Sequence, residues 1–310
     1  MIQAGADARK PIVATKESAQ VKSGDVKKNN SVNVAILTLI AIIASAFALY
    51  PILWIFSTAL NPANSLINAT IIPSRVGFDN FVHLTDNPQR PVFLWIFNSV
   101  KVAGISAAIV VVVTALAAYS FSRFRYKGRR AGLLTILLIQ LFPNMLSIVA
   151  LFLLLQQIGN IPGLSWLGLN THGGLILIYT GGALGFNTWL MKGYFDTIPK
   201  DLDEAATIDG ASRFEVFWQI IFPLARPILA VMAILTFIGV YGDFLIAKVM
   251  LKERDSFTLM IGLGQMIQGR TEDWGVFAAA ALVGALPIVL VFLVLQKQLI
   301  GGLSSGAVKG

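Results

Sequence analysis

The chain offers few side chains that could do chemistry. Its two histidines, His83 and His172, have no carboxylate at the spacing of a metal site. The segment Gly302–Gly306 matches the G-x-S-x-G pattern in which a serine acts as a nucleophile. That motif requires a strand before the serine, a helix after it and a histidine base nearby. In the topology deduced below, both histidines lie on the other side of the membrane, so we interpret this match as accidental.

Two absences narrow the chemistry further. The sequence contains no Gly-Lys dipeptide and therefore no Walker A loop to bind phosphates. It contains no cysteine, which excludes disulfides, thiolate metal sites and a cysteine nucleophile. We therefore expect neither a catalytic residue nor a metal or cofactor on this chain. If it takes part in driven work, ATP and Mg²⁺ would be bound by partner subunits.

Composition predicts an integral membrane protein. Hydrophobic residues make up 56% of the 310 residues and charged residues 13%, about half the charge of an ordinary soluble domain. Runs of about 20 apolar residues are long enough to cross a bilayer as helix. We find six, at about 34–56, 102–121, 133–155, 174–191, 228–247 and 276–295. The predicted fold class is an all-α integral membrane protein with six transmembrane helices.

The net charge of +8 is explained by topology. The tail 1–33 carries six basic residues and the loop 122–130 carries five. Since basic loops remain in the cytoplasm, both termini and the loops near 125 and 210 are predicted to be cytoplasmic. The expected organisation is a disordered cytoplasmic tail (1–33), a transmembrane domain (34–301) and a cytoplasmic C-terminal tail (302–310).

Two features of the predicted topology each have two interpretations. Asp243 is the one side chain that is clearly ionisable within a predicted span. It is either part of a gate or of a contact with the partner permease, or a charge at a helix end. The outer loop 248–275 is either a periplasmic docking element or an ordinary connector. Gly181 and Gly185 form a G-x-x-x-G that would permit close helix packing, but no function is assigned to it.

The stretch Asp201–Pro223, DLDEAATIDGASRFEVFWQIIFP, is a charged interruption between the fourth and fifth spans. Asp201 is predicted as the N-cap of a short helix that Gly210 would end in the left-handed conformation. Ser212 and Glu215 form a capping box for a second helix, which Pro223 would stop. One basic residue against five acids excludes DNA binding. An amphipathic linker on the membrane and a docking element for a cytoplasmic partner both fit this pattern.

The motif EAATIDGA, followed by IIFP, resembles the EAA signature of permease subunits of binding-protein-dependent ABC importers. The family commonly has Leu where this chain has Phe222. Further blocks, among them Asn98–Ser106, Gly168–Gly174, Trp274–Ala281 and the tail 302–310, are similar to the maltose/maltodextrin members of that family. The resemblance covers nearly everything after residue 34.

The resemblance implies a role for three groups of residues. The EAA loop, 196–227, would contain the helix that couples this chain to an ATPase. Its implied coupling residues are Glu204, Ala205, Ala206, Asp209, Gly210, Ala211 and Pro223. The C-terminal tail would contact the ATPase through Gly302, Leu303, Ser304, Gly306 and Lys309. The loop 248–275 would enter the cleft of the binding protein through Ser256, Phe257, Thr258, Gly264 and Gln265.

The implied partners are a MalF-like second permease subunit, two MalK-like ATPase subunits and a periplasmic sugar-binding protein, in the bacterial inner membrane and without nucleic acid. The resemblance places the principal transmembrane sugar contacts on the second permease, so no substrate-binding residue is named. Alternatives are a permease for another sugar or derivative, such as trehalose or glycerol phosphate, and a self-sufficient secondary carrier. Sparse charges within the spans disfavour the carrier, and the lack of a convergent site disfavours a membrane enzyme.

Overall fold

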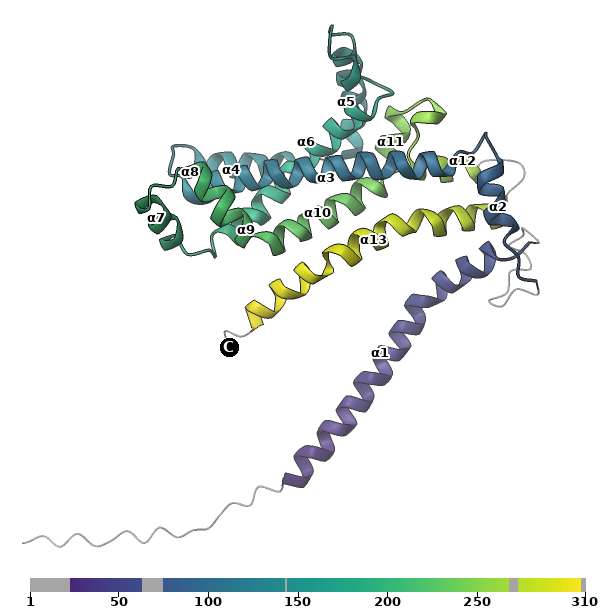
Figure 1. The fold of residues 1–310 in the computed structure, drawn as a ribbon, viewed down its shortest axis with the longest axis horizontal. Helices are drawn as coiled ribbons and strands as arrows, with labels where there is room; N and C mark the ends of the chain where they lie inside the picture. Colours follow the sequence, from purple (N-terminus) through teal and green to yellow (C-terminus); the bar gives the residue numbers. More distant parts are fainter. Residues whose placement is uncertain (1–22, 63–74, 143, 268–272, 308–310) are drawn as a thin grey trace, which may run out of the picture. The chain divides into compact units, whose positions relative to one another are not determined.

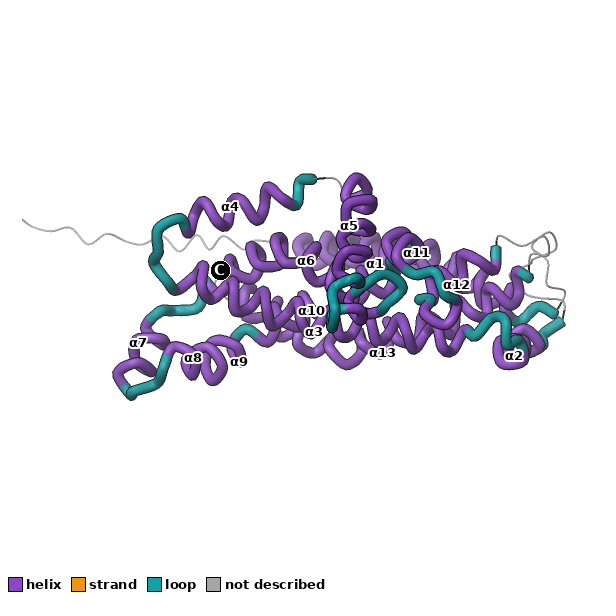
Figure 2. The backbone as a smooth tube through the Cα atoms, turned by 90° about the horizontal axis from the view of Figure 1, so that it is seen from above, coloured by secondary structure: helices purple, strands orange, loops and turns teal. Residues whose placement is uncertain are grey.

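The structure is a computed structural model that describes residues 23–62, 75–142, 144–267 and 273–307. Within these residues the chain forms helices and loops and no strand (Figure 2). The α-helices are α1 (Ser23–Ala59), α2 (Asp79–Asp86), α3 (Val92–Arg123), α4 (Arg129–Ile139), α5 (Asn144–Gly159), α6 (His172–Phe195), α7 (Asp201–Ile208), α8 (Arg213–Glu215), α9 (Phe222–Leu224), α10 (Arg226–Tyr241), α11 (Leu245–Met250), α12 (Leu259–Met266) and α13 (Trp274–Ala307). The all-helical class predicted from composition is confirmed.

The chain divides into two compact units, residues 1–53 and 54–310. In its described part the first unit consists of residues 23–53 of helix α1, and the last residues of this helix, 54–59, belong to the second unit. The apolar segment Asn33–Ala59 of α1 has the length and composition of a membrane span. Pro51 lies inside this helix. Its side chains are almost entirely apolar beyond Asn33, as a helix surrounded by lipid or by other apolar helices requires.

The second unit is built on three long helices that pack side by side, α3, α6 and α10 (Figure 1). Helix α13 packs against α10, and its N-terminal part packs against α2. Helices α7 and α8 lie at one end of the bundle, and α2 and α12 lie at the other (Figure 1). We call these the α7 end and the α12 end.

Among the residues that the structure describes, four helices are long and apolar enough to span a membrane, and a bent pair, Arg213–Leu224 with Arg226–Tyr241, gives a fifth candidate. The run 133–155, predicted as one span, is two helices, α4 and α5. The 11 residues of α4 rise about 16 Å, about half of a hydrocarbon core. Helix α5 runs across the direction of α3 and α6 (Figures 1 and 2). Pro143, which lies between them in the sequence and outside the described residues, has no N–H for a continuous helix.

The fifth apolar run also ends earlier than predicted. Helix α10 stops at Tyr241, and a separate short helix, α11, begins at Leu245. The Asp243 carboxylate accepts a hydrogen bond from the Ala247 backbone N–H (3.1 Å) and one from the Tyr179 hydroxyl (2.7 Å). A side chain that bonds to nearby backbone competes with continuation of a helix. Asp243 therefore lies at a helix end, as one of its two interpretations proposed.

The α12 end is held onto helix α3 by buried polar side chains. The Asn98 amide donates to the carbonyls of Asp255 (2.8 Å) and Phe257 (3.0 Å). The Trp95 indole N–H donates to the carbonyl of Arg254 (3.0 Å). Gly262 lies against the Trp95 ring, where an added Cβ would stand 1.9 Å from a ring carbon. These contacts fix the segment before α12 on the bundle.

We predict that Asn98→Leu destabilises the protein. Leucine has a similar volume but leaves two carbonyls without their donor, at about 1–3 kcal/mol for each buried group. The midpoint of thermal unfolding in detergent should fall clearly. Gln296→Leu is the matched control, because among the described residues that amide bonds within its own exposed helical turn, to the carbonyl of Leu293 (3.1 Å). Equal midpoints for the two variants would contradict the anchoring role of Asn98.

Candidate functional site

The loop 196–227 begins with helix α7, which starts one residue earlier than its sequence indicated. Lys200, not Asp201, is the N-cap, and it makes no side-chain capping bond. Lys200 already has helical backbone angles, and its carbonyl accepts from the N–H groups of Asp203 (2.9 Å) and Glu204 (3.1 Å). The prediction of Asp201 as the cap is therefore wrong. Asp201, Asp203 and Glu204 lie in the first turn, where negative charge interacts favourably with the helix dipole.

Gly210 ends α7, as predicted. Its φ of +90° lies in the left-handed region that glycine adopts without strain. The Ala211 N–H bonds to the Ala206 carbonyl (2.9 Å) and the Gly210 N–H bonds to that of Thr207 (3.1 Å). These two bonds form a Schellman motif, which satisfies the last carbonyls of the helix. A residue with a Cβ at position 210 would strain this turn.

The second helix begins with the predicted capping box. The Ser212 hydroxyl accepts from the Glu215 N–H (3.3 Å), and the Glu215 carboxylate accepts from the Ser212 N–H (2.7 Å). A π-helical turn, Val216–Ile221, follows α8. The prediction that Pro223 stops this helix is wrong, because α9 continues to Leu224 and the chain then bends by 76° at Ala225. Pro223 is the second residue of α9, which follows the π-helical turn without a break.

A buried ion pair attaches α7 to the end of α3. Arg123 Nε lies 2.5 Å from Asp203 Oδ2, and the two side chains are 4% and 6% exposed. Arg123 also donates from Nη2 to the Ile198 carbonyl (2.9 Å). Burial raises the pKa of the Asp203 carboxyl, and the charge of Arg123 opposes that shift. The carboxylate therefore depends on the guanidinium to stay ionised in this position.

Further contacts around this ion pair tie the loop to the bundle. The Tyr119 hydroxyl donates to the Arg213 carbonyl (3.3 Å), and its ring packs on Phe217. The Ser122 hydroxyl donates to Asp196 Oδ1 (2.7 Å), and Asp196 also pairs with Lys192. Ala206, Val216, Phe217 and Ile221 join the same apolar cluster as residues of α3, α6 and α10. The loop therefore packs as a fixed part of the α7 end.

The outward side of the loop remains apolar. Leu202, Phe214 and Ile208 are 41%, 65% and 85% exposed. Glu204, Ala205, Asp209 and Gly210 are exposed beside them. Of the two alanines expected to allow a close approach, only Ala205 faces outward, since Ala206 is buried against the bundle. Exposed apolar side chains around a small residue on a rigidly held helix form a surface that another protein can cover.

The other predicted contact residues lie in two separate places. Phe257 and Thr258 are buried at the α12 end, whereas Ser256, Gly264 and Gln265 are partly exposed. Lys252, Glu253, Arg254 and Asp255 form the exposed part of the same segment. Gly302, Leu303, Ser304 and Gly306 lie in the last part of α13, which continues through Ala307, and Lys309 lies outside the described residues. Contact with partner proteins stays a prediction for both groups.

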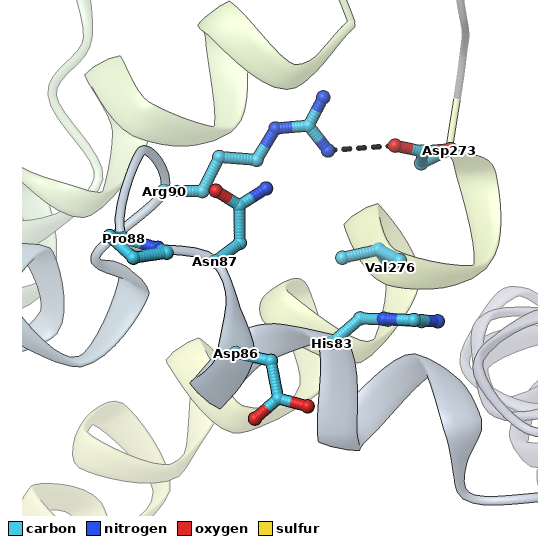
Figure 3. Close-up of a pocket in the computed structure, with 7 residues that line it drawn as sticks. All are labelled: His83, Asp86, Asn87, Pro88, Arg90, Asp273 and Val276. Atoms are coloured by element: carbon cyan, nitrogen blue, oxygen red, sulfur yellow. Dashed lines mark hydrogen bonds and ion pairs between the residues drawn. The ribbon is translucent and has the colours of Figure 1, made fainter.

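A small polar pocket of about 350 Å³ lies beside α2 at the α12 end (Figure 3). Arg90 and Asp273 form an ion pair at 2.8 Å on its rim. His83 and Asp86 line it from α2, and Val276 lines it from α13 (Figure 3). Within the described residues no group of three or more His, Cys, Asp or Glu side chains could hold a metal ion. The pocket links the loop before α3 to the start of α13.

Sequence reasoning missed the Arg123–Asp203 ion pair. Each charge had an adequate local explanation, because Arg123 belongs to a basic loop and Asp203 belongs to the first turn of an acidic helix. One feature of the sequence indicates that Asp203 faces inward. Asp203 and Ala206 are three residues apart, so both lie on the side of α7 opposite Ile208.

The fold and this loop define a class, the helical membrane proteins that span the bilayer several times and expose a short helix at one end. The model of a family described as "binding-protein-dependent transport system inner membrane component" matches residues 110–300. That range includes the end of α3, the ion pair and the whole loop 196–227. The chain belongs to this family.

Individual relatives agree with this assignment. The maltose/maltodextrin transport system permease protein MalG of Escherichia coli K12 is 39% identical over 295 residues, covering 91% of this chain and 98% of the relative. MalG of Vibrio vulnificus YJ016 is 46% identical over 224 residues, covering 72% and 74%. The galactooligosaccharides transport system permease protein GanQ of Bacillus subtilis 168 is 38% identical over 288 residues, covering 92% and 99%.

A solved structure has a similar fold. The crystal structure of a bacterial ABC transporter involved in the import of the acidic polysaccharide alginate contains a chain with a TM-score of 0.70 and 25% identity. The similarity covers 89% of this chain and 98% of that one. The arrangement of helices described above is thus one that a sugar-importing ABC transporter also uses.

We predict that Asp203→Asn releases α7 from the bundle. The variant leaves the Arg123 guanidinium buried without a counter-charge, which costs about 3–5 kcal/mol. Amide hydrogens of Leu202–Ile208 should then exchange faster by two orders of magnitude or more. Lys192→Gln is the control, because it breaks a more exposed ion pair whose contribution is about 0–1 kcal/mol. Similar exchange in the two variants would refute the clamping role of the ion pair.

Proposed function

We propose that this chain is a permease subunit of an ATP-driven importer for maltose/maltodextrin or a related oligosaccharide, in the bacterial inner membrane. It would form half of the transmembrane path through six spans, with both termini in the cytoplasm. In this topology α4 and α5 together replace the third span, and α10 is the fifth. The α7 end would then face the cytoplasm, in agreement with the basic residues of the loop 122–130.

The observation that carries this proposal is the outward apolar surface of α7, clamped to α3 by the Arg123–Asp203 ion pair. A helix held in this way can transmit a push from a docked subunit to the membrane helices. We propose that α7 docks on an ATPase subunit, which would supply ATP and Mg²⁺, since this sequence has no phosphate-binding loop. The chain itself would be non-catalytic.

The complete importer would contain this chain, a second permease, two ATPase subunits and a periplasmic sugar-binding protein. ATP would close the ATPase dimer, move the docked α7 helices together and shift the path from inward-facing to outward-facing. The exposed segment Lys252–Asp255 and its neighbours Ser256, Gly264 and Gln265 would face the binding protein.

The relatives support two different oligosaccharides. The two MalG proteins favour maltose/maltodextrin, whereas GanQ, which matches 92% of this chain against 91% for MalG of Escherichia coli, favours galactooligosaccharides. Titrating the cognate binding protein with both kinds of sugar, followed by uptake assays in cells that express all subunits, distinguishes them. A binding protein that takes neither kind would refute the proposed substrate class.

We predict that Gly210→Val abolishes uptake while the chain still inserts in the membrane. Valine strains the left-handed turn by about 1 kcal/mol or more and displaces the end of α7 from the ATPase. Sugar uptake should fall at least tenfold, and less ATPase should co-purify in mild detergent. Gly128→Val is the matched control, since Gly128 has a φ of +85° and, like Gly210, open space around its Cβ position. Loss of uptake in both variants would point to general strain instead.

We also predict that Glu204→Ala weakens ATPase attachment without unfolding α7. Glu204 is exposed and lies in the first turn beside Asp201, which is also exposed. Asp201→Ala removes the same charge from the same turn and serves as the control. Uptake and ATPase co-purification should fall several-fold for Glu204→Ala only. Normal uptake in the Glu204 variant would contradict its assignment as a docking residue.

A further inference from the structure

A groove lies between helices α4, α6 and α10, about midway along α6. Its volume is about 420 Å³, within the roughly 300–1,000 Å³ range of small-molecule sites. No residue that lines it is ionisable. The lining includes three uncharged polar side chains, an aromatic ring and two glycines, namely Gln140, Asn187, Thr236, Phe186, Gly182 and Gly239.

The polar side chains of this groove have unused hydrogen-bonding capacity. Gln140 Nε2 donates to the Gly182 carbonyl at 2.8 Å. Asn187 Nδ2 lies 3.5 Å from Thr236 Oγ1, at the outer limit of a hydrogen bond, and the described residues provide no other partner for this amide. Each amide has two N–H donors and an oxygen with two lone pairs. Both side chains can therefore donate to and accept from a further molecule.

The groove lies where a helix is interrupted. Helix α4 ends at Ile139 and α5 begins at Asn144, and the bond from Gln140 to Gly182 places this interruption beside the middle of α6. At such depth in a bilayer, non-helical backbone persists only where it is buried in protein or lines a water-filled cavity. In transporters, discontinuous helices near the midplane form binding sites. In a bilayer the groove must therefore be filled by water or a ligand, or be covered by another protein chain.

Two glycines leave open space on two sides of the groove. A Cβ added at Gly182 or Gly239 would meet nothing within 4 Å. At Gly185, by contrast, an added Cβ would stand 2.8 Å from the Ile136 carbonyl oxygen, because α4 packs closely there. The G-x-x-x-G of α6 thus contains one helix contact, Gly185, and one open position, Gly181. Gly182 and Gly239 border the same groove as the polar side chains.

We propose that this groove binds hydroxyl groups of the transported saccharide, so that this subunit contributes its own substrate contacts through Asn187, Gln140 and Thr236. The inference rests on the proposed function. A neutral saccharide presents hydroxyls that both donate and accept, which uncharged amides and a hydroxyl complement. The absence of charge from the lining keeps such contacts weak enough for release. The family resemblance implies that the principal sugar contacts lie on the second permease, and the proposed contacts on this subunit add to them.

The test uses the complete importer in proteoliposomes, with binding protein loaded with a radiolabelled maltodextrin. Saccharide uptake and ATP hydrolysis are measured on the same vesicles. Asn187→Leu should lower uptake about fivefold, as expected for loss of about one neutral hydrogen bond, with ATP hydrolysis within twofold of the parent. Gln156→Leu, an exposed amide on α5 outside the groove, should change neither rate. Asn187→Ser replaces the leucine variant if that variant does not assemble.

A second variant blocks the groove without removing a polar group. Gly239→Leu should lower uptake at least tenfold while ATP hydrolysis continues, so that more ATP is used for each saccharide moved. Gly104→Leu, at an open glycine of α3 outside the groove, is its control.

Two results would overturn the inference. Unchanged uptake in both groove variants would show that no saccharide passes there. If the groove variants lose uptake and ATP hydrolysis together and the second permease no longer co-purifies with them, the groove is a subunit interface. A parent complex that hydrolyses ATP but imports no saccharide would instead refute the proposed function, independently of either groove variant.

Discussion

The Arg123–Asp203 ion pair is the interaction on which the arrangement of the α7 end depends. Two fully buried charges are expensive to desolvate, and they are retained here where the last residue of a long apolar helix meets the inner face of a short one. The pair fixes which face of α7 points inward. It thereby leaves Leu202, Ala205 and Ile208 on the outside, where a partner can reach them.

The three long helices, the Gly210 turn and the Ser212 capping box were predictable because each depends on residues near one another in the sequence. Apolar length sets a membrane helix, and φ and capping chemistry act within a few residues. The interruptions between Ile139 and Asn144 and between Tyr241 and Leu245 were not predictable from hydropathy, since both segments are apolar apart from Gln140 and Asp243. At the second of these, the Asp243 carboxylate bonds to the Ala247 backbone N–H, a contact that hydropathy does not register.

The functional residues show the same division. The EAA signature located α7, but it did not separate Ala206, which packs inward, from Ala205, which is exposed. The ion pair joins residues of distant segments, and the groove at Gln140 and Asn187 joins three helices. Pairings of this kind depend on tertiary packing, which one sequence without relatives does not report. The signature residues therefore identify α7 but not the buried contacts that hold it in place.

The buried ion pair also bears on how the protein is made. Synthesis proceeds from the N-terminus, so Arg123 leaves the ribosome well before Asp203 exists. Until then its guanidinium has no counter-charge and must extend toward water or lipid headgroups at the membrane surface, as long basic side chains do at helix ends. In the proposed topology, this exposed charge would first help to orient helix α3, and α7 would later cover it on folding. One arginine would then serve in turn as a topological signal during insertion and as a structural partner of Asp203 in the finished protein.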